Sequence, residues 1–182
     1  MYFGESMYKN EPVRLIKDLF DGQKILLPEE AGIYVFWWLG DKDHLMNSNR
    51  TQVLKGPGEK PVAITFEDWW PDYLEHPCLY VGKSTNIKKR FSLHLKRGSK
   101  GRLHAIPSSN EKQRAVTTSC QLRYGIEHIF PEHEEPLDLI SSNVGFSYMT
   151  KFSGENPTIE RFFTEDLLIG QYRPWFNIDS ER

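Results

Sequence analysis

The sequence has few of the features that mark membrane, secreted or disulfide-bonded proteins. Its only cysteines, Cys78 and Cys120, form no CxxC pair, which favours a reducing, intracellular setting. The longest apolar run, residues 33–39, is far too short to span a bilayer. The first residues lack the basic start and apolar centre of a signal peptide. We therefore expect a cytoplasmic protein with no membrane partner.

A zinc site also finds little support in the sequence. Cys78 and Cys120 stand far apart, and His128 and His133 have no accompanying CxxC pair. The 182 residues, 38% hydrophobic and 26% charged, are typical of one soluble globular domain with a core of its own. We treat residues 1–182 as that single domain.

The net charge is small, but the charged residues are unevenly distributed. The formal net charge is only −2, yet no acidic residue occurs between Glu75 and Glu111. A local basic field of this kind attracts phosphate groups, although a solvated helix face is the alternative reading. The basic residues of this stretch are Lys83, Lys88, Lys89, Arg90, Lys96, Arg97, Lys100 and Arg102.

The same stretch predicts a short strand that leads directly into a helix. Residues 79–81 favour a strand, Gly82 ends it, and Ser84 or Thr85 can cap the helix. Arg90 and His94 lie four residues apart, so they emerge together from one edge of the helix. The expected buried stripe of this helix is Ile87, Phe91 and Leu95.

Two further segments are expected to complete a small antiparallel sheet. Residues 33–39 are rich in β-formers and nearly all apolar, as expected of a strand buried on both faces. Antiparallel pairing with residues 79–81 would bring Tyr34 and Tyr80 close together. Residues 144–152 alternate well enough to form the third strand.

A late helix is predicted from its N-terminal signals. Asn156 and Pro157 supply a cap and a first-turn proline, and the helix runs to Tyr172. Glu165 falls within the apolar stripe, where a carboxylate is costly to bury unless it is paired or holds a cation. We expect the buried face of this helix to consist of Ile159, Phe162, Phe163, Leu167 and Ile169.

The remaining segments are expected to be insertions or supporting elements. We predict a hairpin from residues 51–55 and 62–65, a loop at 98–110, and helices at 10–21 and 119–130. The adjacent Trp69 and Trp70 either cover the core or stack on a splayed base, and core covering is favoured.

Several of these residues occur together in the order of a known family. Gly32-Ile33-Tyr34, Tyr80-Val81-Gly82, Arg90 with His94, Glu165 and Asn177 resemble the GIY-YIG nuclease domain, with Val81 in place of the usual isoleucine. The resemblance covers about residues 31–178, with insertions at about 40–77 and 98–143. It implies an α/β (α+β) fold, with a three-stranded antiparallel sheet flanked by helices.

The resemblance also implies roles in phosphodiester cleavage. Glu165 would hold Mg²⁺ or Mn²⁺, and Arg90 would contact the scissile phosphate. The sequence does not decide which group is the general base. We favour Tyr34 assisted by His94, with Tyr80 as an orienting partner.

The other residues carried over support this site. Asn177 would orient Glu165 or the neighbouring loop as an outer-shell amide, and Lys83 would touch phosphate. Further DNA contacts are expected from the basic stretch, at Lys88, Lys89, Lys96, Arg97, Lys100 and Arg102.

The expected function is therefore a metal-dependent DNA endonuclease, site-selective in the manner of restriction or repair enzymes and dimeric if each subunit cuts one strand. One rival is a catalytically inactive nucleic-acid-binding module of the same fold. Another is a structural protein whose basic helix meets an acidic protein surface.

Overall fold

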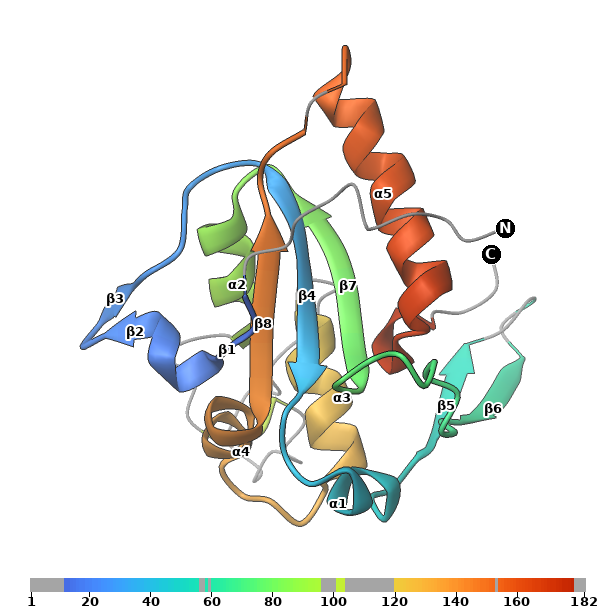
Figure 1. The fold of residues 1–182 in the computed structure, drawn as a ribbon. Helices are drawn as coiled ribbons and strands as arrows, with labels where there is room; N and C mark the ends of the chain where they lie inside the picture. Colours follow the sequence, from blue (N-terminus) through green and yellow to red (C-terminus); the bar gives the residue numbers. More distant parts are fainter. Residues whose placement is uncertain are drawn as a thin grey trace.

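The fold is described from a computed structural model, which covers residues 12–55, 58, 60–95, 101–103, 120–152 and 154–178 (Figure 1). Most of the segment expected to form the loop 98–110 lies outside these residues. In chain order the elements are β1 (Arg14–Leu15), η1 (Ile16–Leu19), β2 (Phe20–Asp21), β3 (Lys24–Ile25), β4 (Gly32–Trp38), α1 (Lys42–Met46), β5 (Thr51–Lys55), β6 (Pro61–Thr65), β7 (Cys78–Ser84), α2 (Ile87–Leu95), α3 (Gln121–Ile129), α4 (Pro136–Asn143), β8 (Val144–Met149), α5 (Pro157–Tyr172) and η4 (Trp175–Asn177).

A mixed α+β architecture is confirmed, but its main sheet has four strands rather than three. The strand order is β1-β8-β4-β7, and every pair is antiparallel. The three expected strands are β4, β7 and β8. The fourth is the two-residue strand β1, which pairs with the outer edge of β8.

Helices cover both faces of this sheet (Figure 1). On β4, Tyr34 meets His94 of α2, whereas Trp37 meets Tyr172 of α5. Because residues three apart on a strand point to opposite faces, α2 and α5 lie on opposite sides of the sheet. Strand β7 is the edge strand between them.

The helix expected at residues 10–21 is wrong over its described part. Arg14 and Leu15 pair with Phe146 and Gly145 of β8 instead. Ile16 and Leu19, which are 0% and 1% exposed, then enter the core from the short 3₁₀ turn η1. Apolar spacing cannot separate these outcomes, because both bury residues three apart.

The buried face predicted for α5 is also wrong. Its ends are as expected, with the Asn156 side chain accepting a hydrogen bond from the Ile159 N–H (3.2 Å), but the core contacts come from Thr164 and Leu168. The expected core residues Ile159, Phe162, Phe163 and Leu167 are 49–70% exposed, and only Ile169 packs partly against the core.

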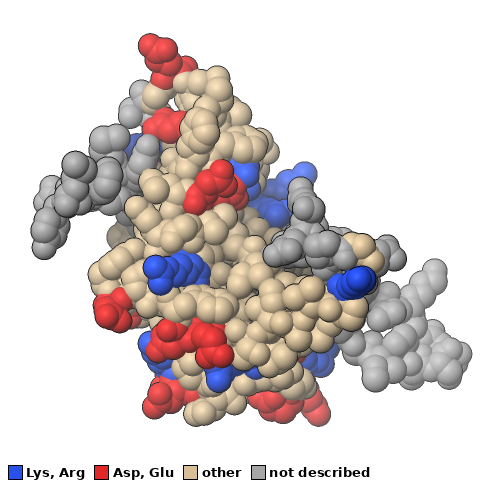
Figure 2. Space-filling model, turned by 90° about the vertical axis from the view of Figure 1, so that its right-hand side faces the viewer, with Lys and Arg blue, Asp and Glu red and all other residues tan. Residues whose placement is uncertain are grey.

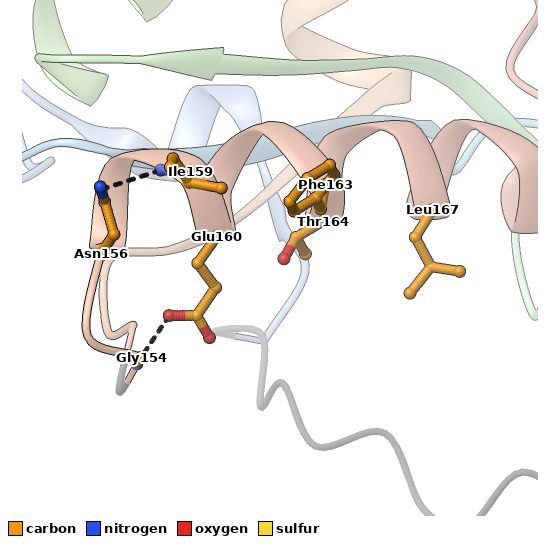
Figure 3. Close-up of a pocket in the computed structure, with 7 residues that line it drawn as sticks. All are labelled: Gly154, Asn156, Ile159, Glu160, Phe163, Thr164 and Leu167. Carbon is orange, nitrogen blue, oxygen red and sulfur yellow. Dashed lines mark hydrogen bonds between the residues drawn. The ribbon is translucent and has the colours of Figure 1, made fainter.

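This exposed apolar row gives α5 a largely uncharged outer surface (Figure 2). Ile159, Phe163 and Leu167 line a pocket of about 340 Å³, shown in Figure 3. At its rim the Glu160 carboxylate accepts a hydrogen bond from the Gly154 N–H (2.8 Å).

The predicted hairpin and insertion helix are present as β5–β6 and α3, whereas α4 was not expected. Trp70 covers the core as favoured: its ring stacks on Trp175 with centroids 4.6 Å apart, and its indole N–H donates to Cys78 O. No helix in the described part of the chain is both long enough and apolar enough to cross a membrane.

Candidate active site

The Tyr34 hydroxyl is the centre of a buried polar cluster between β4 and α2. The Arg90 Nε–H donates to Tyr34 Oη at 3.0 Å, and His94 Nε2 lies 2.8 Å from the same oxygen. Arg90 and His94 reach it together because they lie one helical turn apart on α2. Arg90 and His94 were expected to emerge together, and both lie at the Tyr34 hydroxyl.

Tyr80 joins this cluster from the neighbouring strand β7. Its ring lies 6.1 Å from that of Tyr34 and 4.9 Å from the His94 ring, measured between centroids. The charge of Arg90 and the hydroxyl of Tyr34 both act on the pKa of its hydroxyl. Tyr80 is 7% exposed and Tyr34 is 1% exposed, so the Tyr80 side of the cluster lies nearer to solvent.

Gly82 makes room for both phenol rings. It pairs directly with Tyr34 across the two strands. A Cβ atom on Gly82 would lie 2.6 Å from Tyr34 Cζ and 2.8 Å from Tyr80 Cε1, closer than real Cβ contacts come. Glycine is therefore required here for space, a role that the sequence analysis, which treated it as a strand end, missed.

Burial dominates the protonation of the cluster. It raises the pKa of Tyr34 far above the ordinary phenol value, and the Arg90 charge offsets only part of this effect. Burial also raises the pKa of Tyr80. Burial, followed by the Arg90 charge, lowers the pKa of His94 well below its usual value, so His94 is neutral near pH 7.

A second group of polar residues lies on the α5 side of β7. The Lys83 ammonium forms an ion pair with the Glu165 carboxylate, whose side chain is 12% exposed. The Lys83 Nζ also lies 4.1 Å from the centroid of the Phe162 ring. The negative charge of Glu165 reaches Tyr80 and adds to the rise in its pKa caused by burial. The two groups therefore adjoin each other around the edge strand.

Glu165 is the carboxylate expected to hold a metal. Within the described ranges, no group of three or more His, Cys, Asp or Glu side chains could hold a metal ion. One carboxylate still suits Mg²⁺, which keeps several waters and shares substrate phosphates. A bound ion would share the Glu165 carboxylate with the Lys83 ammonium. The residues present therefore fit the predicted ion.

Asn177, expected to orient Glu165 or the neighbouring loop, bonds to strand β7. Its side-chain amide accepts from the Val81 N–H (2.7 Å) and donates to Val81 O (2.8 Å). These two bonds satisfy the outer edge of β7 at the residue between Tyr80 and Gly82. Asn177 therefore holds the strand that carries Tyr80 and does not orient Glu165.

The basic stretch is only partly available for DNA. Lys89 is exposed, whereas Lys88 pairs with Glu29 at 2.8 Å and Lys83 pairs with Glu165. Lys96, Arg97 and Lys100 lie outside the described residues.

Arg102, predicted to bind DNA, is directed at backbone carbonyl groups. Its guanidinium donates to Glu127 O, to Phe130 O (3.2 Å) and to His133 O (2.6 Å). These carbonyl groups lie at and just beyond the C-terminal end of α3, where helix carbonyls lack intrahelical partners. Arg102 therefore caps α3.

Two residues near the cluster were missed as site residues. Phe162 was expected in the core, although its position three residues before Glu165 places both side chains on the same side of α5. Leu122 of α3 contributes only its backbone N–H, which donates to His94 Nδ1 at 3.4 Å. A backbone donor leaves no signal in the sequence.

Comparison of the chain with protein-family models, with curated proteins and with solved structures found no match.

Proposed function

We propose that the protein is a metal-dependent endonuclease that hydrolyses DNA phosphodiester bonds. One observation carries the proposal. Tyr34, Arg90 and His94 from β4 and α2 form one hydrogen-bonded cluster, the Tyr80 ring of β7 packs against it, and the Lys83–Glu165 pair adjoins it. Arg90, Lys83 and Glu165 place two cations and a carboxylate beside the strands β4 and β7.

The cations of the site suit a phosphate. Arg90 donates its Nε–H to Tyr34, and its planar guanidinium has further N–H groups that can donate to phosphate oxygens. Lys83 supplies a second positive charge beside Glu165. Preorganised donors of this kind stabilise the extra negative charge of a pentacoordinate phosphorus transition state.

The carboxylate suits the binding of a metal ion, and the phenols suit the transfer of a proton from the attacking water. A divalent ion on Glu165, when bound, supplies Lewis acidity. The attacking water must also lose a proton, and the phenol oxygens of Tyr34 and Tyr80 are the acceptors that the cluster offers.

Plasmid nicking with Mg²⁺ or Mn²⁺ tests this proposal. Glu165→Ala should abolish nicking, because it removes the carboxylate that would hold the ion. Asp166→Ala is the matched control: it removes the adjacent, exposed carboxylate and should leave nicking intact. Equal nicking by wild type and Glu165→Ala would rule out the proposed site.

The rival function is a nucleic-acid-binding module without turnover. DNA binding with no cleavage across several divalent metals would favour it. For the enzyme, the inserted hairpin β5–β6 and helix α3 favour a site-selective nuclease of restriction or repair type, and two copies would be needed to cut both strands of a duplex.

A further inference from the structure

The chain between β6 and β7 passes the C-terminal end of α5 and is bonded to it (Figure 1). The Trp69 indole N–H donates to Arg173 O at 2.9 Å, and one N–H of the Arg173 guanidinium donates to Trp69 O at 3.2 Å. The Tyr73 hydroxyl donates to Gln171 O at 2.9 Å. These bonds satisfy carbonyl groups at the end of the helix, where intrahelical partners are missing. They also fix Trp69 and Arg173 relative to each other.

A pocket of about 310 Å³ lies at this junction. The neighbouring Trp70 is 8% exposed and stacks on Trp175 in the core, whereas Trp69 is only half-buried and lines the pocket. The pocket therefore has one aromatic wall, further apolar walls and two polar side chains. The other lining residues are Ile169, Arg173, Pro174, Asn177 and Ile178.

Both polar side chains keep hydrogen-bonding capacity beyond their contacts within the protein. Asn177 uses one amide hydrogen and one oxygen lone pair on Val81, which leaves one of each. Arg173 gives one N–H of its guanidinium to Trp69, and its other N–H groups remain. Amide and guanidinium groups are the side chains that recognise the donor and acceptor edges of nucleobases. An aromatic ring with such groups beside it suits a base.

The backbone of Arg173 is unusual. Its φ is 48°, and within the described ranges it is the only non-glycine residue with a positive φ. Glycine is the common residue in this conformation after a helix, because a Cβ atom disfavours the left-handed region. Residues held in such conformations cluster at functional sites. The strain at Arg173 therefore marks the pocket as more than a packing defect.

The pocket adjoins the candidate active site. Ile169 lies one helical turn after Glu165 on the same side of α5, about 6 Å along the helix axis. Asn177 connects the two places, because it lines the pocket and also bonds the edge of β7, the strand that carries Tyr80. A strand of DNA bound at that site would therefore pass the pocket with its next nucleotide.

We propose that this pocket binds one unstacked nucleobase of the DNA, from a nucleotide adjoining the phosphate that is cut. The base stacks on the Trp69 ring, and Arg173 and Asn177 bond its edge. This inference deepens the proposed function and rests on it. It gives part of the inserted segment 40–77 a role in holding the substrate.

Two single-stranded DNA oligomers of equal length separate base stacking from charge. One is oligothymidine, and the other has abasic residues throughout, so both carry the same phosphate charge. With EDTA present to prevent cleavage, wild type should bind oligothymidine more tightly than the abasic oligomer. Trp69→Leu should reduce this ratio of affinities by roughly 5-fold or more, because stacking on the indole ring is lost. The salt dependence of binding should not change, because no charge is altered.

Two further variants guard against effects on folding. Tyr73→Phe is the matched control: it removes a bond from the same segment to the end of α5 but changes no residue of the pocket. It should keep the wild-type ratio. Arg173→Gly relieves the backbone strain, since glycine suits a φ of 48°, and removes the guanidinium. It should reduce the ratio.

The indole ¹H–¹⁵N signal of Trp69, identified by its absence in Trp69→Phe, reports on the pocket itself. Oligothymidine should shift this signal, and the abasic oligomer should not. An unmoved signal, or the same affinity ratio in wild type and Trp69→Leu, would overturn the proposal, and plasmid nicking would still decide the proposed function. Loss of a dimer in Trp69→Leu with an unchanged ratio would assign the pocket to a second copy of the chain instead. A protein that shows the shift and the ratio but cuts no DNA would support the pocket and refute the nuclease.

Discussion

At the scale of single residues, Gly82 sets the spacing of the candidate site. Tyr34 lies directly across from it on β4, and Tyr80 precedes it by two residues on the same face of β7. Both phenol rings occupy the space that a side chain would need. The GIY-YIG resemblance placed a glycine here, but only the packing of the two rings explains why.

Gly82→Ala is expected to push the phenols apart. Overpacking of this kind costs about 1–3 kcal/mol of stability, and a displaced catalytic group reduces the rate roughly 100-fold. Urea denaturation and plasmid nicking measure the two effects. Gly170→Ala is the control: nothing lies within 4 Å of its Cβ position, so it should stabilise α5 by about 0.5–1 kcal/mol. A Gly82→Ala variant with unchanged stability and unchanged nicking would contradict the packing described.

His94 makes stability depend on pH. Its pKa in the folded protein is lowered by burial and by Arg90, so the unfolded chain takes up a proton that the folded protein does not. The contribution of His94 to the free energy of unfolding is therefore complete above about pH 6.5, the ordinary histidine pKa. Below that pH the contribution falls by up to about 1.4 kcal/mol per pH unit.

Urea denaturation of wild type and His94→Gln between about pH 7.5 and 5 checks this sign, because the window brackets the ordinary histidine pKa. The stability advantage of wild type should shrink as the pH falls. A constant difference between the two proteins would show that His94 takes up its proton equally in both states.

At the scale of elements, α5 shows what periodicity does and does not reveal. Its ends were predictable, because Asn156 and Pro157 are local signals. Its orientation was not predictable, because an apolar stripe does not show which part of the protein packs against it. The core takes Thr164 and Leu168, and this rotation brings Glu165 beside Lys83 while Phe163 faces outward.

The stability losses caused by alanine substitutions on α5 should therefore rank in the opposite order to the sequence prediction. Phe163 is 70% exposed, so Phe163→Ala is expected to lower the free energy of unfolding by no more than about 0.5 kcal/mol. Leu168, 4% exposed, should cost about 2–5 kcal/mol. Urea denaturation compares the two directly. A larger loss for Phe163 would mean that its ring is covered after all.

Supporting elements were harder to predict than the strands of the site. β4 and β7 follow from continuous β-forming residues, whereas β1 is only two residues long and depends on its pairing with β8. The contact of α3 with His94 comes from a backbone N–H, which every residue except proline carries. Neither feature has a sequence pattern of its own.

At the scale of the whole molecule, the basic stretch divides into exposed and internal charges. Lys89 is exposed on α2, whereas Arg102 is directed at the carbonyl groups of α3. A count of basic residues in the sequence cannot make this distinction, because it depends on where the fold places each side chain.

The salt dependence of DNA binding should separate these two charges. Lys89→Gln is expected to reduce the slope of log K against log salt by about one, because one phosphate contact is lost. Arg102→Gln should leave the slope unchanged and instead lower the stability measured by urea denaturation. The reverse pattern would show that Arg102 faces the nucleic acid.

We propose that the cluster around Arg90 performs phosphodiester cleavage. Single-turnover cleavage of one DNA substrate by wild type and Arg90→Lys, at protein concentrations that saturate binding, tests it most directly. Lysine keeps the charge but cannot bond Tyr34 and a phosphate in the same geometry, so the rate should fall by roughly 100-fold or more with little change in affinity. Equal rates for the two proteins would contradict the account.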